Sequence, residues 1–233
     1  MILSLVQTKG GTGKTTISRG LAYSKAFQKH FKSSICLIEL DPQGSLSAWH
    51  KQRQESGFKE KVKFVNLAKV EIKELEKELI NLSSQNELII LDVAGESVGR
   101  FMTKFAIALS DIVLFPMRSS ADDEQSFRDN LYPIIQDNFN SDSKSNVYHI
   151  IPTFVHPQTK LETIKSYFEE IKPDEVQCLN AFLPYRGVFE NYSRNGMNQY
   201  EYAKLVENNA RQHGQALKAI GDIEVIAKAI LTI

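Results

Sequence analysis

The sequence predicts an α/β fold in which a doubly wound, mainly parallel sheet carries helices on both of its faces. Short, strongly apolar segments alternate with amphipathic segments along the chain, and this order is typical of parallel strands joined by helices. The chain has 233 residues, which is enough for one substantial α/β domain and short for two. We therefore expect a single domain over residues 1–233.

The first half of the chain predicts four strands, and each strand is followed by a helix. The strands are apolar runs rich in β-forming residues, at residues 2–7, 34–40, 62–67 and 87–93. The helices are expected at residues 15–30, 45–54, 71–83 and 98–109. The third helix shows the helical spacing most clearly, because its apolar residues recur in steps of three and four at Ile72, Leu75, Leu79 and Leu82.

The second half continues the pattern with three strands and three helices. Strands are expected at residues 111–117, 147–154 and 176–183, and helices at residues 122–139 and 160–171. A last helix is predicted from about residue 222 to the end, because apolar residues recur there at helical spacing: Ile223, Ile226, Ile230 and Ile233. Residues 140–146 are polar and are expected to form a loop.

The composition is that of a globular protein without a strong net charge. Lys and Arg total 28, and so do Asp and Glu, so charge alone does not indicate a protein that coats nucleic acid. The two cysteines, Cys36 and Cys178, lie in apolar runs, and we expect buried free thiols rather than a disulfide or a metal site. No apolar stretch approaches the roughly 20 residues that cross a bilayer, and we expect a cytoplasmic protein without a signal peptide.

A phosphate-binding loop is predicted between the first strand and the first helix, at residues 9–16 (Lys-Gly-Gly-Thr-Gly-Lys-Thr-Thr). Glycines let backbone N–H groups approach phosphate oxygens, and the start of the helix adds its dipole. Lys14 is expected to neutralise the β- and γ-phosphates, and the Thr15 hydroxyl to bind Mg²⁺. An ordinary glycine-rich turn would not explain two lysines and two threonines at this spacing. The residues predicted to surround the phosphates are Lys9, Gly10, Gly11, Thr12, Gly13, Lys14, Thr15 and Thr16.

This loop opens with a lysine, and in this respect it resembles the deviant Walker A motif of the ParA/MinD ATPases. The resemblance implies ATP and ADP as ligands, Mg²⁺ as the cofactor and an ATP-bound homodimer. It also implies that Lys9 reaches across the dimer to the ATP of the partner, much as an arginine finger acts in trans. Taken alone, Lys9 would be a solvated loop lysine. The loop begins within the first ten residues, so we expect no helix-turn-helix extension before it.

Two carboxylates are predicted to complete the nucleotide site, because each follows an apolar strand at its carboxyl end. Asp41, in Asp-Pro-Gln-Gly, is expected to reach the Mg²⁺ shell or to orient an attacking water, although a turn residue before proline is the simpler reading of the dipeptide. The ParA family has Asp-x-Asp-Pro-Gln here; Glu39 replaces the first acid, and we assign it no role. Asp92 ends an apolar strand in the form of a Walker B motif and is expected near Mg²⁺, where a lone acid would otherwise cap a helix.

Several further segments resemble the short, ParF-like plasmid partition ATPases. These are Asp-Val-Ala-Gly-Glu-Ser from Asp92, the tryptophan that follows Asp-Pro-Gln-Gly-Ser-Leu, and the last helix. Glycines at both ends of residues 95–99 favour a segment that senses the γ-phosphate. The resemblance also implies that Pro184 and Arg186 contact adenine, although an ordinary edge turn explains the same residues.

The resemblance implies a role in DNA segregation. Relatives bind DNA without sequence preference in their ATP-bound form, and a centromere-binding partner of the ParB or ParG kind stimulates hydrolysis. Such contacts are sequence-independent and sensitive to salt, and they would place the protein on the nucleoid. The candidate residues, which read equally well as scattered solvated charges, are Arg194, Lys204, Arg211 and Lys218, with Arg186 beside them.

Three other functions share this core. The same switch could position a protein cargo, such as a chemoreceptor array or a microcompartment. A small-molecule ligase of the same fold is disfavoured by Lys9 together with Asp-Pro-Gln. A MinD-like membrane role needs a basic amphipathic C-terminal helix, whereas residues 227–233 contain one lysine.

Overall fold

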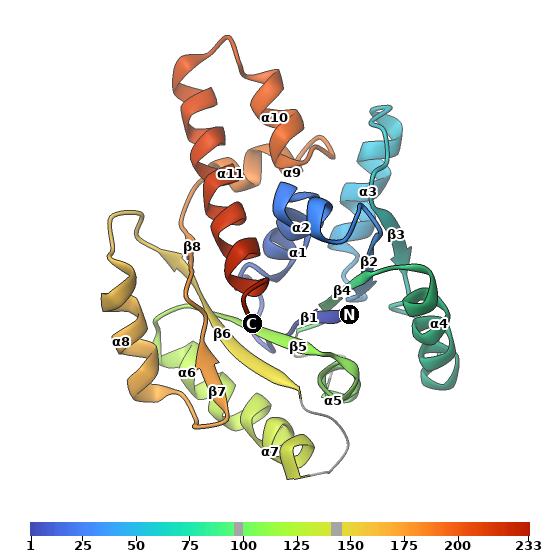
Figure 1. Ribbon diagram of the computed structural model, residues 1–233, viewed down its shortest axis with the longest axis vertical. Coiled ribbons are helices and arrows are strands. Elements are labelled where there is room, and N and C mark those ends of the chain that lie inside the picture. The colour runs from blue at the N-terminus through green and yellow to red at the C-terminus, as the bar shows by residue number, and fades with distance from the viewer. Residues whose placement is uncertain (96–99, 141–145) are drawn as a thin grey trace.

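The computed structural model describes residues 1–95, 100–140 and 146–233. Within these residues the strands form one eight-stranded sheet in the order β3-β2-β4-β1-β5-β6-β7, and β8 pairs with β6 beyond this path (Figure 1). Every described pairing is parallel. The predicted doubly wound α/β fold is therefore confirmed.

The central strands are short and buried. They comprise β1 (Ile2–Leu5), β2 (Ile35–Leu40), β4 (Leu88–Val93), β5 (Ile112–Met117) and β6 (Val147–Val155). The outer strands are β3 (Lys63–Asn66), β7 (Val176–Cys178) and the two-residue β8 (Leu183–Pro184). From β1 the chain runs to one side through β2 and β3, returns to β4 beside β1, and continues on the other side through β5, β6 and β7, so its winding reverses beside β1. In such a sheet ligands bind outside the carboxyl ends of the strands at the reversal point.

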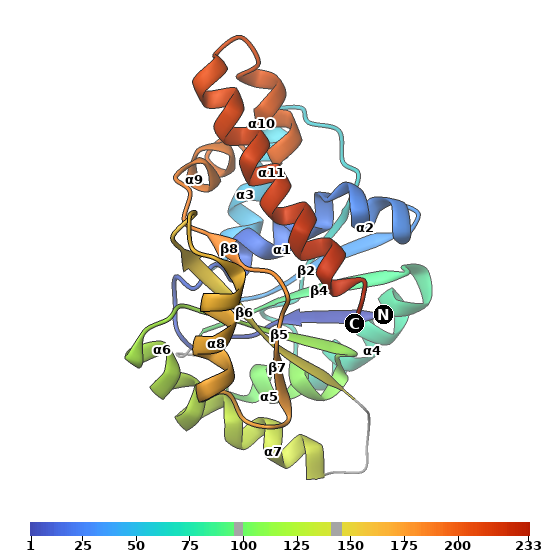
Figure 2. The same ribbon diagram turned by 60° about the vertical axis from the view of Figure 1, so that its left-hand side comes forward.

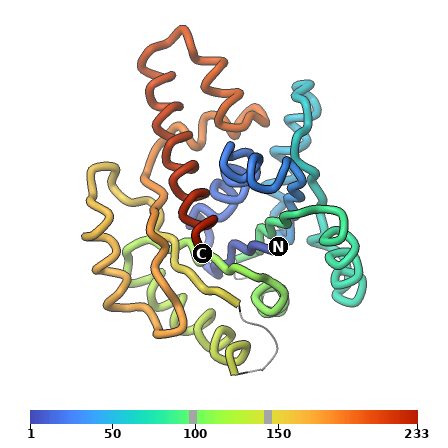
Figure 3. The backbone as a smooth tube through the Cα atoms, viewed as in Figure 1, coloured from blue at the N-terminus to red at the C-terminus, as the bar shows by residue number. Residues whose placement is uncertain are grey.

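Helices cover both faces of the sheet (Figure 2). One face carries α1 (Lys14–Tyr23), α2 (Lys25–His30), α3 (Ser45–Glu55) and the C-terminal group α9 (Val188–Ser193), α10 (Gln199–Leu205) and α11 (Ala210–Ile230). The opposite face carries α4 (Ile72–Gln85), α5 (Arg100–Leu109), α6 (Ala121–Ser126), the π-helical turn η1 (Phe127–Leu131), α7 (Tyr132–Asn140) and α8 (Leu161–Ile171). Figure 3 shows α10 and α11 rising as a helical hairpin beyond the sheet.

Alternation along the strands builds one apolar core on each face. In β2, Ile35 and Leu37 pack with α1 and α11, whereas Cys36 and Ile38 pack with α4. Because successive side chains of a strand point to opposite faces, the continuous apolar runs fill both cores. Both cysteines are free and buried, and burial raises the pKa of each thiol to about 11. Among the described residues, no helix is both long enough and apolar enough to span a bilayer.

Four predicted elements differ from the structure, and one of them, the helix expected at residues 122–139, is divided into α6, η1 and α7. The helix expected at residues 15–30 divides at Ser24, which has extended backbone angles and whose hydroxyl accepts from the Phe27 amide. The strand expected at 176–183 is two strands, β7 and β8. The last helix begins at Ala210 rather than near residue 222, and α9 and α10 lie in a region where no helix was expected. Residues 96–99, part of the predicted phosphate-sensing segment, and residues 141–145, part of the predicted loop, lie outside the described residues.

Candidate functional site

A cleft of about 750 Å³ lies at the carboxyl ends of β1, β2 and β4. This volume is typical of a small-molecule or cofactor site. The cleft gathers residues far apart in the sequence: Gly10, Gly11, Thr12, Gly13, Lys14, Thr15 and Thr16 from the phosphate loop, Asp41 after β2, Pro184 at the end of β8 and Arg186 after it. Two predicted residues, Lys9 and Asp92, do not line it directly.

The phosphate loop depends on two glycines with positive φ. Gly11 has φ 70° and Gly13 has φ 95°, in the left-handed region that other residues rarely adopt. Gly13 is also the N-cap of α1, and it provides no side chain for capping. The first N–H groups of α1 are therefore left for a ligand, which is the arrangement that binds phosphate at helix N-termini.

Lys14 is nearly buried and folded against its own loop. Its Nζ donates to the carbonyl oxygens of Gln7, at 3.0 Å, and Lys9, at 3.4 Å. Burial lowers the pKa of Lys14, and the negative charges of Asp92 and Asp41 act in the opposite direction. A cation that bonds only to carbonyls in a half-buried loop is well placed to pair with phosphate oxygens.

Asp92 lies beneath the loop, at the end of β4. Its Oδ2 accepts from the Thr15 hydroxyl at 2.8 Å, and its Oδ1 accepts from the Ser18 hydroxyl at 3.1 Å. The carboxyl group is 1% exposed, and burial raises its pKa to about 6 despite the hydrogen bonds from Thr15 and Ser18 and the charge of Lys14. The carboxylate is therefore joined directly to the threonine that follows Lys14 in the phosphate loop.

These residues fit a magnesium ion held partly by the nucleotide. No three His, Cys, Asp or Glu side chains meet as a metal cluster in the described parts of the chain. Mg²⁺, however, usually keeps several waters and takes only one or two protein oxygens besides phosphate. The Thr15 hydroxyl and the Asp92 carboxylate are two such oxygens at the edge of the cleft, and Asp41 is a third on its rim.

Asp41 is held by a local turn and by a buried neighbour that sequence reasoning left without a role. Its Oδ1 accepts from the Gln43 amide at 2.9 Å. Glu39, which is fully buried, accepts from the backbone amides of Leu46 at 2.7 Å and Ser47 at 3.0 Å. Glu39 thus caps α3 in place of its N-cap, Gly44, and fixes the Asp41 turn between β2 and α3. The sequence shows an acid two residues before Asp41, but it does not show that this acid is buried or that it accepts from the amides of Leu46 and Ser47.

Lys9 points away from the cleft in this structure. Its Nζ lies 3.1 Å from an Asp122 carboxylate oxygen and 3.8 Å from an oxygen of Asp123. Asp123 is fully buried, and although burial favours its neutral form, hydrogen bonds from Arg118 hold its pKa below the usual value. The side chain of Lys9 is therefore held by two acids at the start of α6, whereas its carbonyl oxygen accepts from Lys14 in the phosphate loop.

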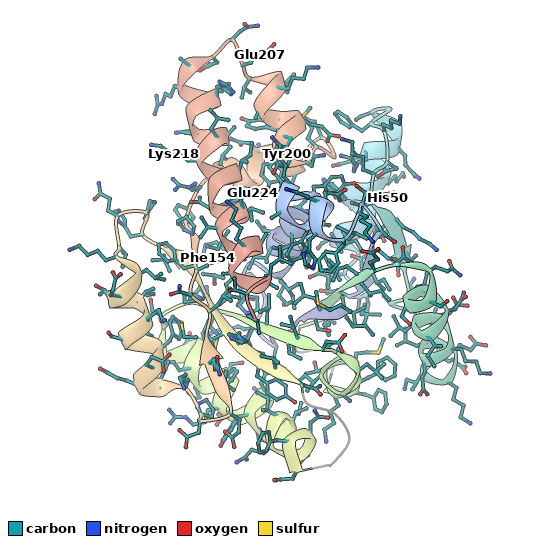
Figure 4. The ribbon with its side chains drawn as sticks, in the orientation of Figure 1. His50, Phe154, Tyr200, Glu207, Lys218 and Glu224 are labelled. Carbon is teal, nitrogen blue, oxygen red and sulfur yellow. The ribbon has the colours of Figure 1, made fainter. Side chains whose placement is uncertain are left out.

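The far end of the cleft is aromatic. Phe154 and Tyr185, which are 41% and 59% exposed, lie with ring centroids 6.2 Å apart, and both line the cleft beside Pro184 (Phe154 is labelled in Figure 4). Phe154 has φ 55°, an uncommon value for a side chain of this size, and β6 changes register at this residue to pair with β8. Sequence reasoning identified neither ring as part of the site.

The other predicted contacts are more scattered. Arg186 lines the cleft, but its guanidinium is held by Asp222, with one Nη2–Oδ1 hydrogen bond of 3.2 Å. The four candidate DNA contacts are exposed on the C-terminal helices, and Figure 4 shows Lys218 on α11. Among the described residues none of the four takes part in an ion pair: Arg194, Lys204, Arg211 and Lys218.

The comparisons with known proteins agree with this geometry. The profile of the CobQ/CobB/MinD/ParA nucleotide binding domain matches residues 3–198. No curated protein sequence matches the chain.

Several solved structures share the fold at low sequence identity. One is a Borrelia burgdorferi protein assigned to plasmid partition and bound to AMPPNP, with 18% identity, coverage of 100% of this chain and 98% of that one, and a TM-score of 0.68. Another is the MinC:MinD cell division protein complex of Aquifex aeolicus, with 13% identity, coverage of 100% and 96%, and a TM-score of 0.66. A third is cobyrinic acid a,c-diamide synthase of Mycobacterium smegmatis with ADP and magnesium, with 16% identity, coverage of 90% and 96%, and a TM-score of 0.55.

Proposed function

Because the chain belongs to the CobQ/CobB/MinD/ParA family of nucleotide-binding domains, we propose that it is a Mg²⁺-dependent ATPase that works as an ATP-driven dimerisation switch. The observation that carries this proposal is the arrangement of the two loop lysines. Lys14 lies inside the cleft, whereas Lys9 lies outside it on an acidic surface site. From this position Lys9 does not contact the phosphates of a nucleotide bound in its own chain, so it is free to contact those of a nucleotide bound by a second chain.

The chemistry requires positioning and charge stabilisation more than covalent catalysis. The backbone N–H groups of residues 10–16 bind the phosphate oxygens, and Lys14 leaves its two carbonyl partners to pair with the β- and γ-phosphates. Magnesium, when bound by Thr15 and Asp92, would withdraw charge from the same phosphates. Asp41, fixed by the Gln43 amide and by the α3 cap, orients the attacking water. Lys9 completes the charge balance in the partner's site only when two chains meet.

The proposed biological task is DNA partition, most directly of a low-copy plasmid. A solved relative of this fold is assigned to plasmid partition. The exposed cations at the end of α9 and on α10 and α11, which form no ion pair with any residue that the structure describes, offer contacts to the phosphate backbone. A dimer would present two copies of this surface. We further propose that a ParB- or ParG-like partner on the plasmid stimulates hydrolysis, and that the ATP form resides on the nucleoid.

DNA binding by the purified protein tests this task. We expect binding to duplexes of unrelated sequence with AMPPNP and Mg²⁺, and none with ADP or without nucleotide. Affinity should fall steeply with salt, because each phosphate contact contributes about −0.9 to the slope of log K against log salt. The double variant Arg211→Ala/Lys218→Ala should reduce that slope and bind DNA more weakly.

A matched variant controls for loss of charge elsewhere. Lys73→Ala/Lys77→Ala removes two exposed cations from α4, on the opposite face of the sheet, and should bind DNA like the wild type. If the wild type binds nucleotide but no DNA in any state, the partition role is wrong. Turnover that depends on an added metabolite would instead favour a synthase of the same fold, such as the one from Mycobacterium smegmatis.

A further inference from the structure

Arg19 is a buried cation on the wall of the cleft. It follows Thr16 by three residues and Thr15 by four, so it lies one turn further along α1 on the same side of the helix. Helical side chains lean toward the N-terminus of their helix, so the side chain extends back toward the phosphate loop. Arg19 lines the cleft and is only 8% exposed.

Burial lowers the pKa of this guanidinium, and the charge of Asp92 acts on it in the opposite direction without forming an ion pair. Its Nε is buried without a hydrogen-bond partner, and among the described residues it forms no ion pair. Glu190 lines the same cleft but is not paired with it. The neighbours of Arg19 are instead aromatic: its guanidinium carbon lies 5.6 Å from the ring centroid of Trp49 and 6.0 Å from that of Tyr192. Tyr192 likewise has a buried hydroxyl without a partner.

Arg53 shows how the same fold treats a buried arginine that serves structure. It is fully buried and also lies over Trp49, at 5.1 Å. Two hydrogen bonds, of 2.6 Å and 3.1 Å, join its guanidinium to Glu201, and the Gly196 carbonyl accepts a third of 2.8 Å. Buried charges are normally paired in this way. Among the described residues the Arg19 side chain forms no such bonds to an acid or a carbonyl, although the Nε of Arg53 is likewise buried without a hydrogen-bond partner. Because Arg19 also lines the cleft, an anionic ligand in the cleft is the partner that its charge requires.

We propose that Arg19 binds the nucleotide directly, at the phosphate nearest the ribose. This inference rests on the proposed function and assigns a contact within that site. Lys14, Thr15 and Asp92 mark the end of the cleft that takes the β- and γ-phosphates. Arg19 packs instead against α9, the helix that follows the Pro184–Arg186 segment at the far end. The planar guanidinium can donate two parallel hydrogen bonds to one phosphate.

The placement predicts which nucleotides depend on Arg19. ATP and ADP both carry the phosphate nearest the ribose, so both should lose affinity when the guanidinium is removed. Arg19→Met keeps a long apolar stem against Trp49 and Tyr192 and removes the charge. We expect its Kd for both Mg-ADP and Mg-AMPPNP to rise about 10- to 100-fold, from the strength of charge-assisted hydrogen bonds. Arg19→Lys retains the charge without the fork and should lose less.

Calorimetric titration of the folded proteins, with Tm measured for each without nucleotide, tests the assignment. Lys29→Met removes an exposed cation from the neighbouring helix α2 and should bind like the wild type. Unchanged affinity in Arg19→Met, with or without a lower Tm, would show that Arg19 only packs the structure. Loss of AMPPNP affinity with ADP unaffected would place the contact at the γ-phosphate and overturn the assignment. A wild type that binds neither nucleotide would overturn the proposed function itself, and this inference with it.

Discussion

At the scale of single residues, the candidate site contains ionisable side chains that are buried in the chain without a ligand. Lys14 bonds to carbonyl oxygens, and Asp92 bonds to the hydroxyls of Thr15 and Ser18. Burial disfavours the charged form of both groups, because it lowers the pKa of Lys14 and raises that of Asp92 to about 6. A magnesium–nucleotide complex supplies opposite charge to each of them. We therefore expect binding and pH to be linked through these two residues.

The Asp92 carboxyl predicts a pH dependence whose sign is fixed by its pKa. Burial raises the pKa of this carboxyl group from its ordinary value of 3.8 to about 6 in the folded protein, so protonation of Asp92 stabilises the folded state at low pH. This stabilisation is lost as the pH rises from about 4 to 6, and the free energy of unfolding then falls by up to about 3 kcal/mol. Asp92→Asn has no charge to bury, and without nucleotide it should be more stable than the wild type by about 1–3 kcal/mol at pH 8. Urea unfolding from pH 5 to pH 8 measures the difference.

The same variant should lose its response to magnesium. Wild-type affinity for Mg-ADP should weaken as the pH falls below about 6, because protonation of Asp92 opposes a bound cation. Asp92→Asn should bind more weakly and show no such inflection.

The unfolding experiment has its own contradicting outcome. If the difference in the free energy of unfolding between the wild type and Asp92→Asn is constant from pH 5 to pH 8, Asp92 does not titrate as described.

Asp41 is predicted to act in hydrolysis and not in binding. It lies on the rim of the cleft with its Oδ1 held by the Gln43 amide, beyond the group that binds phosphate. Asp41→Ala should therefore retain ATP, hydrolyse it at least about 100-fold more slowly, and accumulate as the ATP dimer. Single-turnover hydrolysis with radiolabelled ATP measures the rate. Rapid hydrolysis by this variant would falsify the role assigned to Asp41.

At the scale of elements, the junction between β2 and α3 positions the turn that carries Asp41. Glu39 at the end of β2 caps α3 through the amides of Leu46 and Ser47 and also accepts from the Asn66 side chain of β3 at 3.0 Å. One buried carboxylate thus joins three elements around the residues between them, which include Asp41. Disturbing Glu39 should reduce both stability and hydrolysis.

Glu39→Gln tests this junction, because an amide keeps the shape but cannot accept at both ends. We expect a loss of about 2–4 kcal/mol in the free energy of unfolding, from hydrogen bonds to a charged group and the lost cap. Glu55→Gln is the matched control. Among the described residues Glu55, which is exposed at the other end of α3, pairs with Lys51 alone. This substitution should therefore change the free energy of unfolding by less than about 0.5 kcal/mol. A Glu39→Gln protein as stable as the control would show that the cap is dispensable.

The regular elements were predictable from sequence, and the irregular ones were not. Apolar runs such as Leu88–Val93 are buried on both faces, so their pattern identifies a strand without knowledge of the fold. The break at Ser24 depends on one capping hydroxyl within a helix-compatible segment. The start of α11 was missed because Gly214 and Gly221 interrupt its apolar spacing. The capping box of α10, between Asn198 and Glu201, was a readable signal.

The residues of the candidate site also fall into two groups: those that a local motif predicts and those that only the tertiary structure brings together. The phosphate loop is local in sequence, so its spacing predicted that residues 10–16 would line the cleft. Arg19, Phe154 and Tyr185 line the same cleft but belong to elements whose meeting depends on the tertiary structure. Phe154, in particular, is placed by a register change in β6 that no short motif announces.

At the scale of the whole molecule, we propose that the nucleotide site is complete only when two chains meet. The cleft holds the groups for nucleotide binding, whereas the loop lysine rests on Asp122 and Asp123 of its own chain. The pair with Asp122 is exposed and weak in water, worth about 1 kcal/mol or less, and the buried Asp123 keeps Arg118 as a partner. A second chain that brings ATP phosphates within reach can therefore replace both contacts of Lys9. Dimerisation is therefore expected to depend on the γ-phosphate and on Lys9.

The mass of the protein in solution shows directly whether dimerisation depends on the γ-phosphate and on Lys9. By analytical ultracentrifugation, the chain of 26.4 kDa should sediment as a monomer with Mg-ADP and at twice that mass with Mg-AMPPNP. Lys9→Ala should bind both nucleotides with affinities within about twofold of the wild type, because Lys9 does not line its own cleft, and should remain a monomer throughout. A wild type that stays monomeric with saturating Mg-AMPPNP, or a Lys9→Ala variant that dimerises normally, would contradict the account.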